Sequence, residues 1–189
     1  MLMKKTIIPL AVLFMIVISE SGAVYAYGPA APKHSSPKMP ENNIYTDPFS
    51  YCNCAGTIDA PDKRYQGEKV PDLMVTGMRK VMKLGGETPS DYIKQTTFWR
   101  CMDRKVFVCM VGANLPCMEK ADLRRTPDQA MRDYCENNLD QDYIPAYVTG
   151  RTTVYEWRCS GKVPAIAKQL FKPDARGFIS DIWYELPAE

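Results

Sequence analysis

Seven cysteines are the side chains of this chain with the widest choice of chemistry. Thiols can pair as disulfides, ligate a metal or exchange electrons, and their spacing helps to separate these roles. Cys52 and Cys54 are one residue apart, whereas redox pairs are usually spaced Cys-x-x-Cys and sit at a helix start. No second pair of thiols or imidazoles at matched spacing completes a zinc site. We therefore expect no metal ligands, and a thiol redox protein using Cys52 and Cys54 is kept as an alternative.

An internal echo in the sequence predicts how the cysteines pair. Two stretches, beginning at Tyr51 and Tyr134, each have Tyr-Cys, a spacer, Trp-Arg-Cys, a short turn and Lys-Val. If each stretch closes one bridge, the two remaining cysteines can close a third bridge across the short loop between them, and Cys54 is the candidate free thiol. The expected disulfides are Cys52–Cys101, Cys135–Cys159 and Cys109–Cys117. A chance recurrence of Trp-Arg-Cys is the alternative to a duplication.

Most catalytic constellations lack a residue they need. The only histidine, His34, lies in a proline-rich segment, so a Ser-His or Cys-His pair has no histidine in the expected folded part. Glycoside hydrolysis needs only two carboxylates at a suitable separation, so a cell-wall hydrolase is a second enzymatic alternative. No spacing singles out a pair, and we expect no catalytic residues and no cofactor. The acids available are Asp59, Asp62, Glu87, Asp91, Glu119, Asp122 and Glu156.

Two features are candidates for binding. The loop formed by Gly112, Ala113, Asn114 and Leu115 lies between two cysteines, and a bridge across its neck would hold it ready to dock. The structural alternative is a stapled turn in which glycine and asparagine supply permissive backbone conformations. The tryptophans, each on an expected strand, either line a sugar-binding face or pack in the core beside the disulfides. They are Trp99, Trp157 and Trp183.

The N-terminus has the pattern of a secretory signal peptide over residues 1–26. Lys4 and Lys5 precede an apolar run over 7–18, and small residues end the segment at Ala26. A membrane helix needs about 20 apolar residues, but this run stops after about a dozen, so an uncleaved anchor is only the alternative. Residues 27–48 contain five prolines and are expected to be a linker. Export predicts a periplasmic or secreted protein with no stable membrane span after cleavage. These compartments are oxidising, so cysteines there form disulfides.

The remaining residues, 49–189, are expected to form a single disulfide-stapled domain. A chain of this size buries about two-thirds of its unfolded surface, which is enough for one core. The segment carries 20 Lys and Arg against 19 Asp and Glu, so it is almost neutral. Nucleic-acid-binding domains normally have a strong basic excess, and we expect no nucleic-acid partner.

The periodicity of apolar residues predicts an α+β fold with an antiparallel sheet of hairpins and two to three peripheral helices. Thr126 is the expected N-cap of the clearest helix, with Gln129 completing a capping box and Cys135 facing inward. The segment 106–111 is apolar on both faces, as in a central strand. Helices are expected over 71–84, 88–93 and 126–138, and strands over 96–102, 106–111, 152–159 and 178–186.

These motifs together resemble an uncharacterised family of small exported bacterial proteins with Trp-Arg-Cys and Gly-Ala-Asn-x-Pro-Cys motifs. The matching segments are 99–101, 106–109, 112–117, 157–159, 176–178 and 183–184. The resemblance covers most of residues 49–189 and implies export and disulfide bonding, but no activity.

The sequence as a whole favours an exported, non-catalytic binding or interaction module of the bacterial cell envelope. The neutral charge, the stapled loops and the missing catalytic constellations are the grounds for this expectation. The expected partner is an unknown envelope protein or glycan. A dimer linked through Cys54 is a further expectation.

Overall fold

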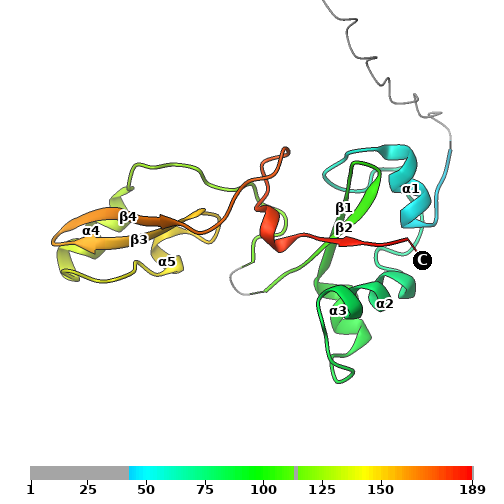
Figure 1. The fold of residues 1–189 in the computed structure, drawn as a ribbon, viewed down its shortest axis with the longest axis horizontal. Coiled ribbons are helices and arrows are strands. Elements are labelled where there is room, and N and C mark those ends of the chain that lie inside the picture. Colours follow the sequence, from blue (N-terminus) through cyan, green and yellow to red (C-terminus); the bar gives the residue numbers. More distant parts are fainter. Residues whose placement is uncertain (1–42, 113–114, 189) are drawn as a thin grey trace, which may run out of the picture. The chain divides into compact units, whose positions relative to one another are not determined.

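The computed structural model describes residues 43–112 and 115–188. The expected signal peptide and residues 27–42 of the expected linker lie outside the described residues. Helices and antiparallel strands alternate along the chain, so the predicted α+β class is confirmed (Figure 1). In chain order the elements are α1 (Pro48–Ala55), α2 (Asp72–Val81), α3 (Ser90–Thr96), β1 (Thr97–Met102), β2 (Lys105–Met110), α4 (Gln129–Asn137), α5 (Ala146–Thr149), β3 (Tyr155–Ser160), β4 (Val163–Gln169), the 3₁₀ turn η1 (Ser180–Ile182) and β5 (Tyr184–Leu186).

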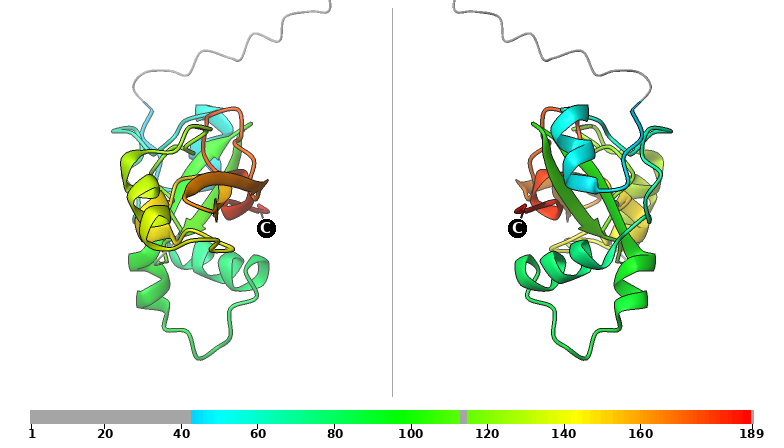
Figure 2. Two further views of the ribbon diagram at one scale, coloured as in Figure 1. Left: turned by 90° about the vertical axis from the view of Figure 1, so that its left-hand side faces the viewer. Right: turned by 90° about the vertical axis from the view of Figure 1, so that its right-hand side faces the viewer.

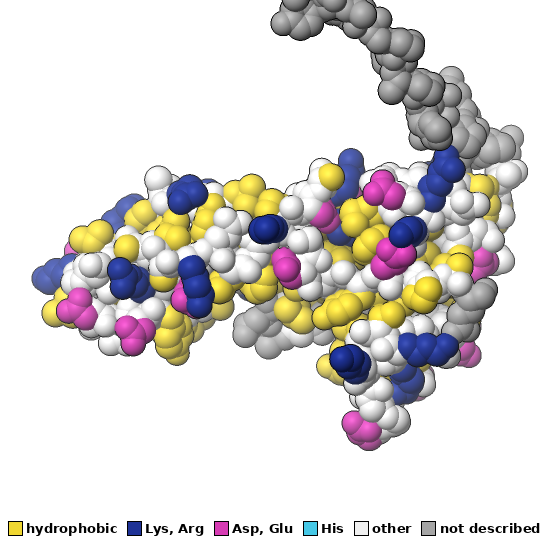
Figure 3. All heavy atoms as spheres, viewed as in Figure 1, with side chains coloured by type: hydrophobic (Ala, Val, Ile, Leu, Met, Phe, Trp, Pro, Cys, Tyr) yellow, Lys and Arg dark blue, Asp and Glu magenta, His cyan; other side chains and the backbone are white. Residues whose placement is uncertain are grey.

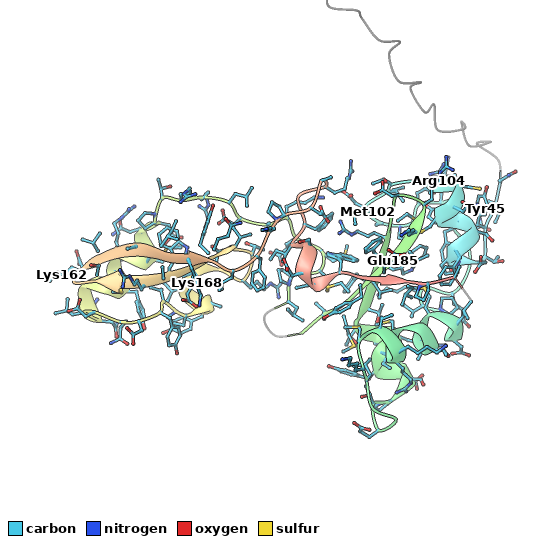
Figure 4. All side chains as sticks on the ribbon, in the orientation of Figure 1. Tyr45, Met102, Arg104, Lys162, Lys168 and Glu185 are labelled. Carbon is cyan, nitrogen blue, oxygen red and sulfur yellow. A yellow bond between two sulfur atoms is a disulfide. The ribbon has the colours of Figure 1, made fainter. Side chains whose placement is uncertain are left out.

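The strands form two antiparallel sheets, ordered β1-β2-β5 and β3-β4. As the sequence predicts, β2 is a central strand, because it pairs with β1 on one side and β5 on the other. An ion pair of 2.9 Å between Lys105 and Glu185 supports the second pairing; Glu185 is labelled in Figure 4. Figure 2 shows α1 at one end of the β1–β2 hairpin, and α2 and α3 at the other.

Alternate residues of the first sheet serve two different cores. Trp99 and Val108 belong to a cluster with α1, α2 and α3, which we call the N-terminal core. Phe98 and Cys109 contact a cluster with α4, β3 and η1, which we call the C-terminal core. Because successive strand residues point to opposite faces, this sheet is covered on both sides. The apolar run of β2 is explained by this double burial.

Arg100 crosses from the first sheet into the C-terminal core. Its side chain is 1% exposed, and its Nη2 donates to the carboxylate of Asp174. The guanidinium carbon lies 4.5 Å from the ring centre of Phe178 and 4.2 Å from that of Trp183. Cations over aromatic faces gain further when they are desolvated. The remaining Arg100 donors, Nε and Nη1, are buried without a hydrogen-bond partner among the described residues, so the guanidinium depends heavily on its one carboxylate.

Asp174 is held ionised by the turn in which it lies. Its Oδ1 accepts hydrogen bonds from the backbone N–H groups of Arg176, at 2.7 Å, and Phe178, at 3.1 Å. Burial alone would raise the pKa of Asp174, but the bonds from Arg100 and from these two amides outweigh it and lower the pKa below its usual value. The same turn reaches Asp59, whose carboxylate accepts from Arg176 Nε at 2.8 Å and from Lys120 Nζ at 2.9 Å.

Three disulfides are present, and they join the pairs expected from the echo: Cys52–Cys101, Cys109–Cys117 and Cys135–Cys159. In each half, a cysteine on a helix is bonded to the first strand of the hairpin that follows, α1 to β1 and α4 to β3. The halves differ at the central arginine, since Arg100 is buried and Arg158 is exposed. Three intramolecular disulfides are consistent with an oxidising compartment.

Helix α1 was not expected from the sequence. It begins at Pro48, the last residue of the expected linker, and Tyr45 already pairs with Tyr65 in a β-bridge. Asp47 caps the helix by accepting from the N–H of Ser50 at 2.7 Å, and proline fits the first turn because it needs no donor there. An Asp-Pro pair was therefore the local signal for this helix.

Two other boundaries differ from the expectation. Asp128, not Thr126, is the N-cap of α4, and its carboxylate accepts from the N–H of Met131 at 3.0 Å. Aspartate is a stronger N-cap than threonine, and its carboxylate satisfies a free N–H of the first turn, so the helix starts after Asp128. The strand expected over 178–186 is shortened to β5, because the N–H and hydroxyl of Ser180 both bond back to the Lys172 carbonyl, each at 2.9 Å, and the chain bends into η1.

Strand β4 is a further element that the sequence did not predict. Pro164 lies within it, and proline is tolerated in a two-stranded sheet because one edge of the strand needs no donors. Within the part of the chain that the structure describes, no helix is both long enough and apolar enough to cross a membrane.

The disulfides should differ in their contribution to stability because they close loops of different length. The sequence separations are 49, 24 and 8 residues for Cys52–Cys101, Cys135–Cys159 and Cys109–Cys117. Loop-closure entropy then predicts losses of about 4, about 3.5 and about 2.5 kcal/mol when each pair is changed to serine. Urea unfolding of the three paired variants measures this order. If the short loop gave the largest loss, the ranking by loop length would be wrong.

Removing Asp174 should destabilise the protein more than removing the whole ion pair. Asp174→Ala leaves a buried guanidinium without a carboxylate, and we expect a loss of about 3–5 kcal/mol. Arg100→Met combined with Asp174→Ala removes both charges and should lose less. Asp142→Ala, at an exposed acid, is the matched control and should stay within about 0.5 kcal/mol of wild type. Equal losses in the single and double variants, measured by denaturant unfolding, would contradict this prediction.

Candidate functional site

The candidate binding loop lies between β2 and the cysteine that closes it. Gly112 and Leu115 form an isolated β-bridge, with the N–H of Leu115 donating to the Gly112 carbonyl at 3.2 Å. Ala113 and Asn114 lie outside the described residues. Leu115 is exposed and stands at the edge of a groove built by residues far along the chain.

This groove has a volume of about 660 Å³ and lies against the first half of β3. One wall is the segment 143–151, which includes α5, and the other is the chain that follows β4. The N–H of Ile144 donates to the carbonyl of Trp157 at 2.6 Å, which fastens the first wall to β3. Gly150 ends α5 at φ 81°, a conformation that favours glycine. We call this hollow the tyrosine groove, and its lining includes Leu115, Tyr143, Ile144, Tyr147, Tyr155, Trp157 and Leu170.

Exposed apolar side chains gather at the rim of the tyrosine groove. Tyr147 is 84% exposed and Tyr143 is 63% exposed, and Leu170 and Leu115 are exposed beside them. The floor is buried, with Tyr155 and Trp157 belonging to the C-terminal core. Figure 3 shows hydrophobic side chains lying among lysines and arginines on the face that carries β4. Concentrated exposed apolar groups around a hollow are typical of a binding surface.

The charged side chains of the groove and its threonines are already bonded within the protein. Arg151 Nε donates to Glu119 Oε1 at 3.0 Å, and Glu156 Oε1 lies 3.5 Å from Lys168 Nζ in an ion pair. Lys168 is labelled on β4 in Figure 4. Thr153 Oγ1 accepts from the N–H of Tyr155 at 3.2 Å. The groove therefore offers apolar contact more than free hydrogen-bonding groups.

Five of the seven carboxylates considered for glycoside hydrolysis are in ion pairs with basic side chains. A general acid needs a raised pKa, so that it is protonated near neutral pH. A hydrogen bond from Arg176 lowers the pKa of Asp59 to about 2, and bonds from Arg64 and Arg124 lower the pKa values of Asp62 and Asp122. Glu119 and Glu156 are in the ion pairs described above. The hydrolase alternative gains no candidate pair from this geometry.

The thiol and tryptophan candidates have different environments. Cys52 is fully buried and bonded to Cys101, so it does not form a dithiol pair with Cys54, which is free and exposed on α1.

All three tryptophans are buried, and the indole N–H of Trp99 donates to the Lys69 carbonyl at 2.6 Å. At no more than 8% exposure, these indoles present little surface for stacking on a sugar ring. Among residues 43–112 and 115–188, no group of three or more His, Cys, Asp and Glu could hold a metal ion.

The tyrosines of the groove were missed from the sequence. Tyr143 and Tyr147 flank Pro145 in a segment without strong periodicity, and Tyr155 begins a strand. Tyrosines clustered around a proline between two regular elements were the available signal, because tyrosine is enriched at interfaces.

Comparisons with known proteins give no relative for this chain: no family model, no curated protein and no solved structure matches it. The role of the site is therefore inferred from its own geometry alone.

Titration of thiols should find one accessible group per native chain. Cys54 is exposed and the other six cysteines are bonded, so alkylation of native protein should label Cys54 alone, and Cys54→Ser should abolish the label. Chains that have dimerised through Cys54 should run as a dimer in non-reducing electrophoresis and take the label only after reduction, and this dimer should be absent in Cys54→Ser. Labelling at a second cysteine would show that one of the three bridges is incomplete.

Proposed function

We propose that this protein is an exported binding module of the bacterial cell envelope that engages a polypeptide through the tyrosine groove. The observation that carries the proposal is the concentration of exposed Tyr143, Tyr147, Leu115 and Leu170 around one hollow. Tyrosine is enriched in interfaces because it combines a large apolar ring with a hydroxyl and loses little conformational entropy on binding.

A polypeptide suits the groove better than a glycan. Glycans are recognised through many hydrogen bonds, but the charged side chains and threonines lining this groove are engaged inside the protein, which leaves mainly the tyrosine hydroxyls for such bonds. Arg151 is paired with Glu119, Glu156 with Lys168, and Thr149 Oγ1 donates to the Gly150 carbonyl at 3.2 Å. Apolar side chains of a partner can displace water from the rim without breaking these bonds.

The groove is also anchored well enough to bind without large rearrangement. Its floor belongs to the C-terminal core, and the Cys135–Cys159 disulfide joins the same strand to α4. A rigid site loses less entropy when a partner docks.

The cellular setting is part of the proposal. The expected signal peptide over 1–26 places the protein in the periplasm or outside the cell. Three disulfides fit that compartment. The resemblance to small exported bacterial proteins supports the same location and suggests no activity.

Binding should be lost when the exposed tyrosines are shortened. Peptides selected from a random dodecamer display library should be rich in apolar and aromatic residues and should perturb NMR signals of 143–157. Tyr147→Ser and Tyr143→Ser should each lower the affinity for the selected peptides about tenfold or more, as expected for an interface anchor. Tyr92→Ser is the control, because Tyr92 is exposed on α3 and does not line the groove; it should change affinity less than twofold.

The same NMR experiment includes a glycan arm. N-acetylglucosamine oligosaccharides should leave the signals of 143–157 unchanged. If the oligosaccharides shift those signals and the selected peptides do not, the polypeptide proposal is wrong and the groove is a sugar site.

A further inference from the structure

A second hollow lies beside the N-terminal core and shares no residue with the tyrosine groove. Its volume is about 390 Å³, within the range of small-molecule sites. It is formed by the segment 60–69, the start of β1 and the residue that follows the Cys109–Cys117 bridge. We call it the Lys69 pocket, and it is lined by Ala60, Pro61, Tyr65, Gly67, Lys69, Phe98, Trp99 and Met118.

Aromatic packing fixes the wall of the Lys69 pocket. The rings of Tyr65 and Trp99 meet edge to face with centres 4.9 Å apart, and Tyr51 contacts both rings from the core side. The Tyr65 hydroxyl donates to the Glu68 carbonyl at 2.7 Å. Rings held in this way keep the pocket open without a ligand, so little ordering is needed on binding.

Lys69 is the one charged side chain in the pocket lining. Its Nζ lies 4.6 Å from the ring centre of Phe98, which holds the ammonium over the apolar surface. Within the described residues, Lys69 has no carboxylate partner in an ion pair. A cation held over apolar rings favours an anion that carries an apolar body.

Nearby acidic groups do not neutralise Lys69. Glu68 Oε2 is in an ion pair with Lys94 Nζ at 3.4 Å, and the carboxylate of Asp62 is paired with Arg64. Burial, followed by the negative charges of Asp47 and Glu68, raises the pKa of Tyr65 to about 12, so the phenol in the wall is uncharged at neutral pH. Glu68 and Asp62 are each paired with a basic side chain other than Lys69.

We propose that the Lys69 pocket binds a small amphiphilic anion, with an aromatic or branched apolar body against Tyr65, Phe98 and Trp99 and one carboxylate or sulfonate at Lys69. The apolar body is buried by the rings and by Met118, which is exposed at the mouth and flexible enough to adapt to the ligand. The anion replaces water at an ammonium that has no ion-pair partner. This activity is independent of the tyrosine groove.

Two fluorescent probes of similar shape test the proposal on the disulfide-bonded protein. 8-Anilinonaphthalene-1-sulfonate is anionic, and N-phenyl-1-naphthylamine is its neutral counterpart. We expect one site for each, with the anion binding more tightly. Lys69→Met should weaken the anionic probe about three- to fivefold, the worth of an exposed ion pair, and change the neutral probe less than twofold.

Three further variants make the result specific. Met118→Glu removes an apolar contact and places a negative charge at the mouth, so it should weaken both probes and the anionic probe more. Lys63→Met removes an exposed lysine that does not line the pocket and should change neither probe. Tyr147→Ser should also change neither, which separates this site from the proposed polypeptide groove. The proposal is overturned if Lys69→Met and Lys63→Met act alike, if both probes weaken equally in Lys69→Met, or if no single-site binding is found.

Discussion

The buried guanidinium of Arg100 is the interaction on which the rest of the structure depends. It leaves the first sheet, enters the C-terminal core between Phe178 and Trp183, and is neutralised by Asp174. A buried charge is costly unless it is paired, so the 174–178 turn must stay in place for the β1–β2 hairpin to be stable. In return, the hairpin fixes the turn. The two cores are thus joined by a polar contact in which neither partner can be removed alone without leaving a buried charge unpaired.

This framework explains why both proposed sites lie on surfaces backed by rigid structure. The floor of the tyrosine groove is C-terminal core, and the wall of the Lys69 pocket is N-terminal core. Neither hollow contains a paired nucleophile and base. Four aspartates have pKa values below the usual range: Asp59, Asp62, Asp122 and Asp174. A stable scaffold with apolar hollows and internally satisfied polar groups is suited to recognition.

Two disulfides were predictable because each belongs to a pattern that recurs along the chain, and the third because Cys109 and Cys117 remain at the two ends of a short loop. Helices α2 and α4 were predictable from periodicity. The burial of Arg100 was not predictable, because Trp-Arg-Cys occurs twice and only one of the two arginines is buried. What decides it is Asp174, 74 residues away, which no local pattern reveals. The groove was missed for a similar reason: its tyrosines lie in a segment without regular periodicity, and tertiary contacts such as the bond from Ile144 to Trp157 bring that segment against β3. Of the two described residues of the expected binding loop, Leu115 lies at the groove and Gly112 does not line it.

Native-state hydrogen exchange tests the central claim most directly, since it measures the opening free energy of each strand separately. If Arg100 and Asp174 join the two cores into one cooperative unit, the slowest amides of β2 and of β3 should open with the same free energy, within about 1 kcal/mol, and that value should equal the global free energy of unfolding. If β3 and β4 exchange through an opening several kcal/mol cheaper than that of β2, the two cores unfold separately, and the Arg100–Asp174 pair does not join them into one unit.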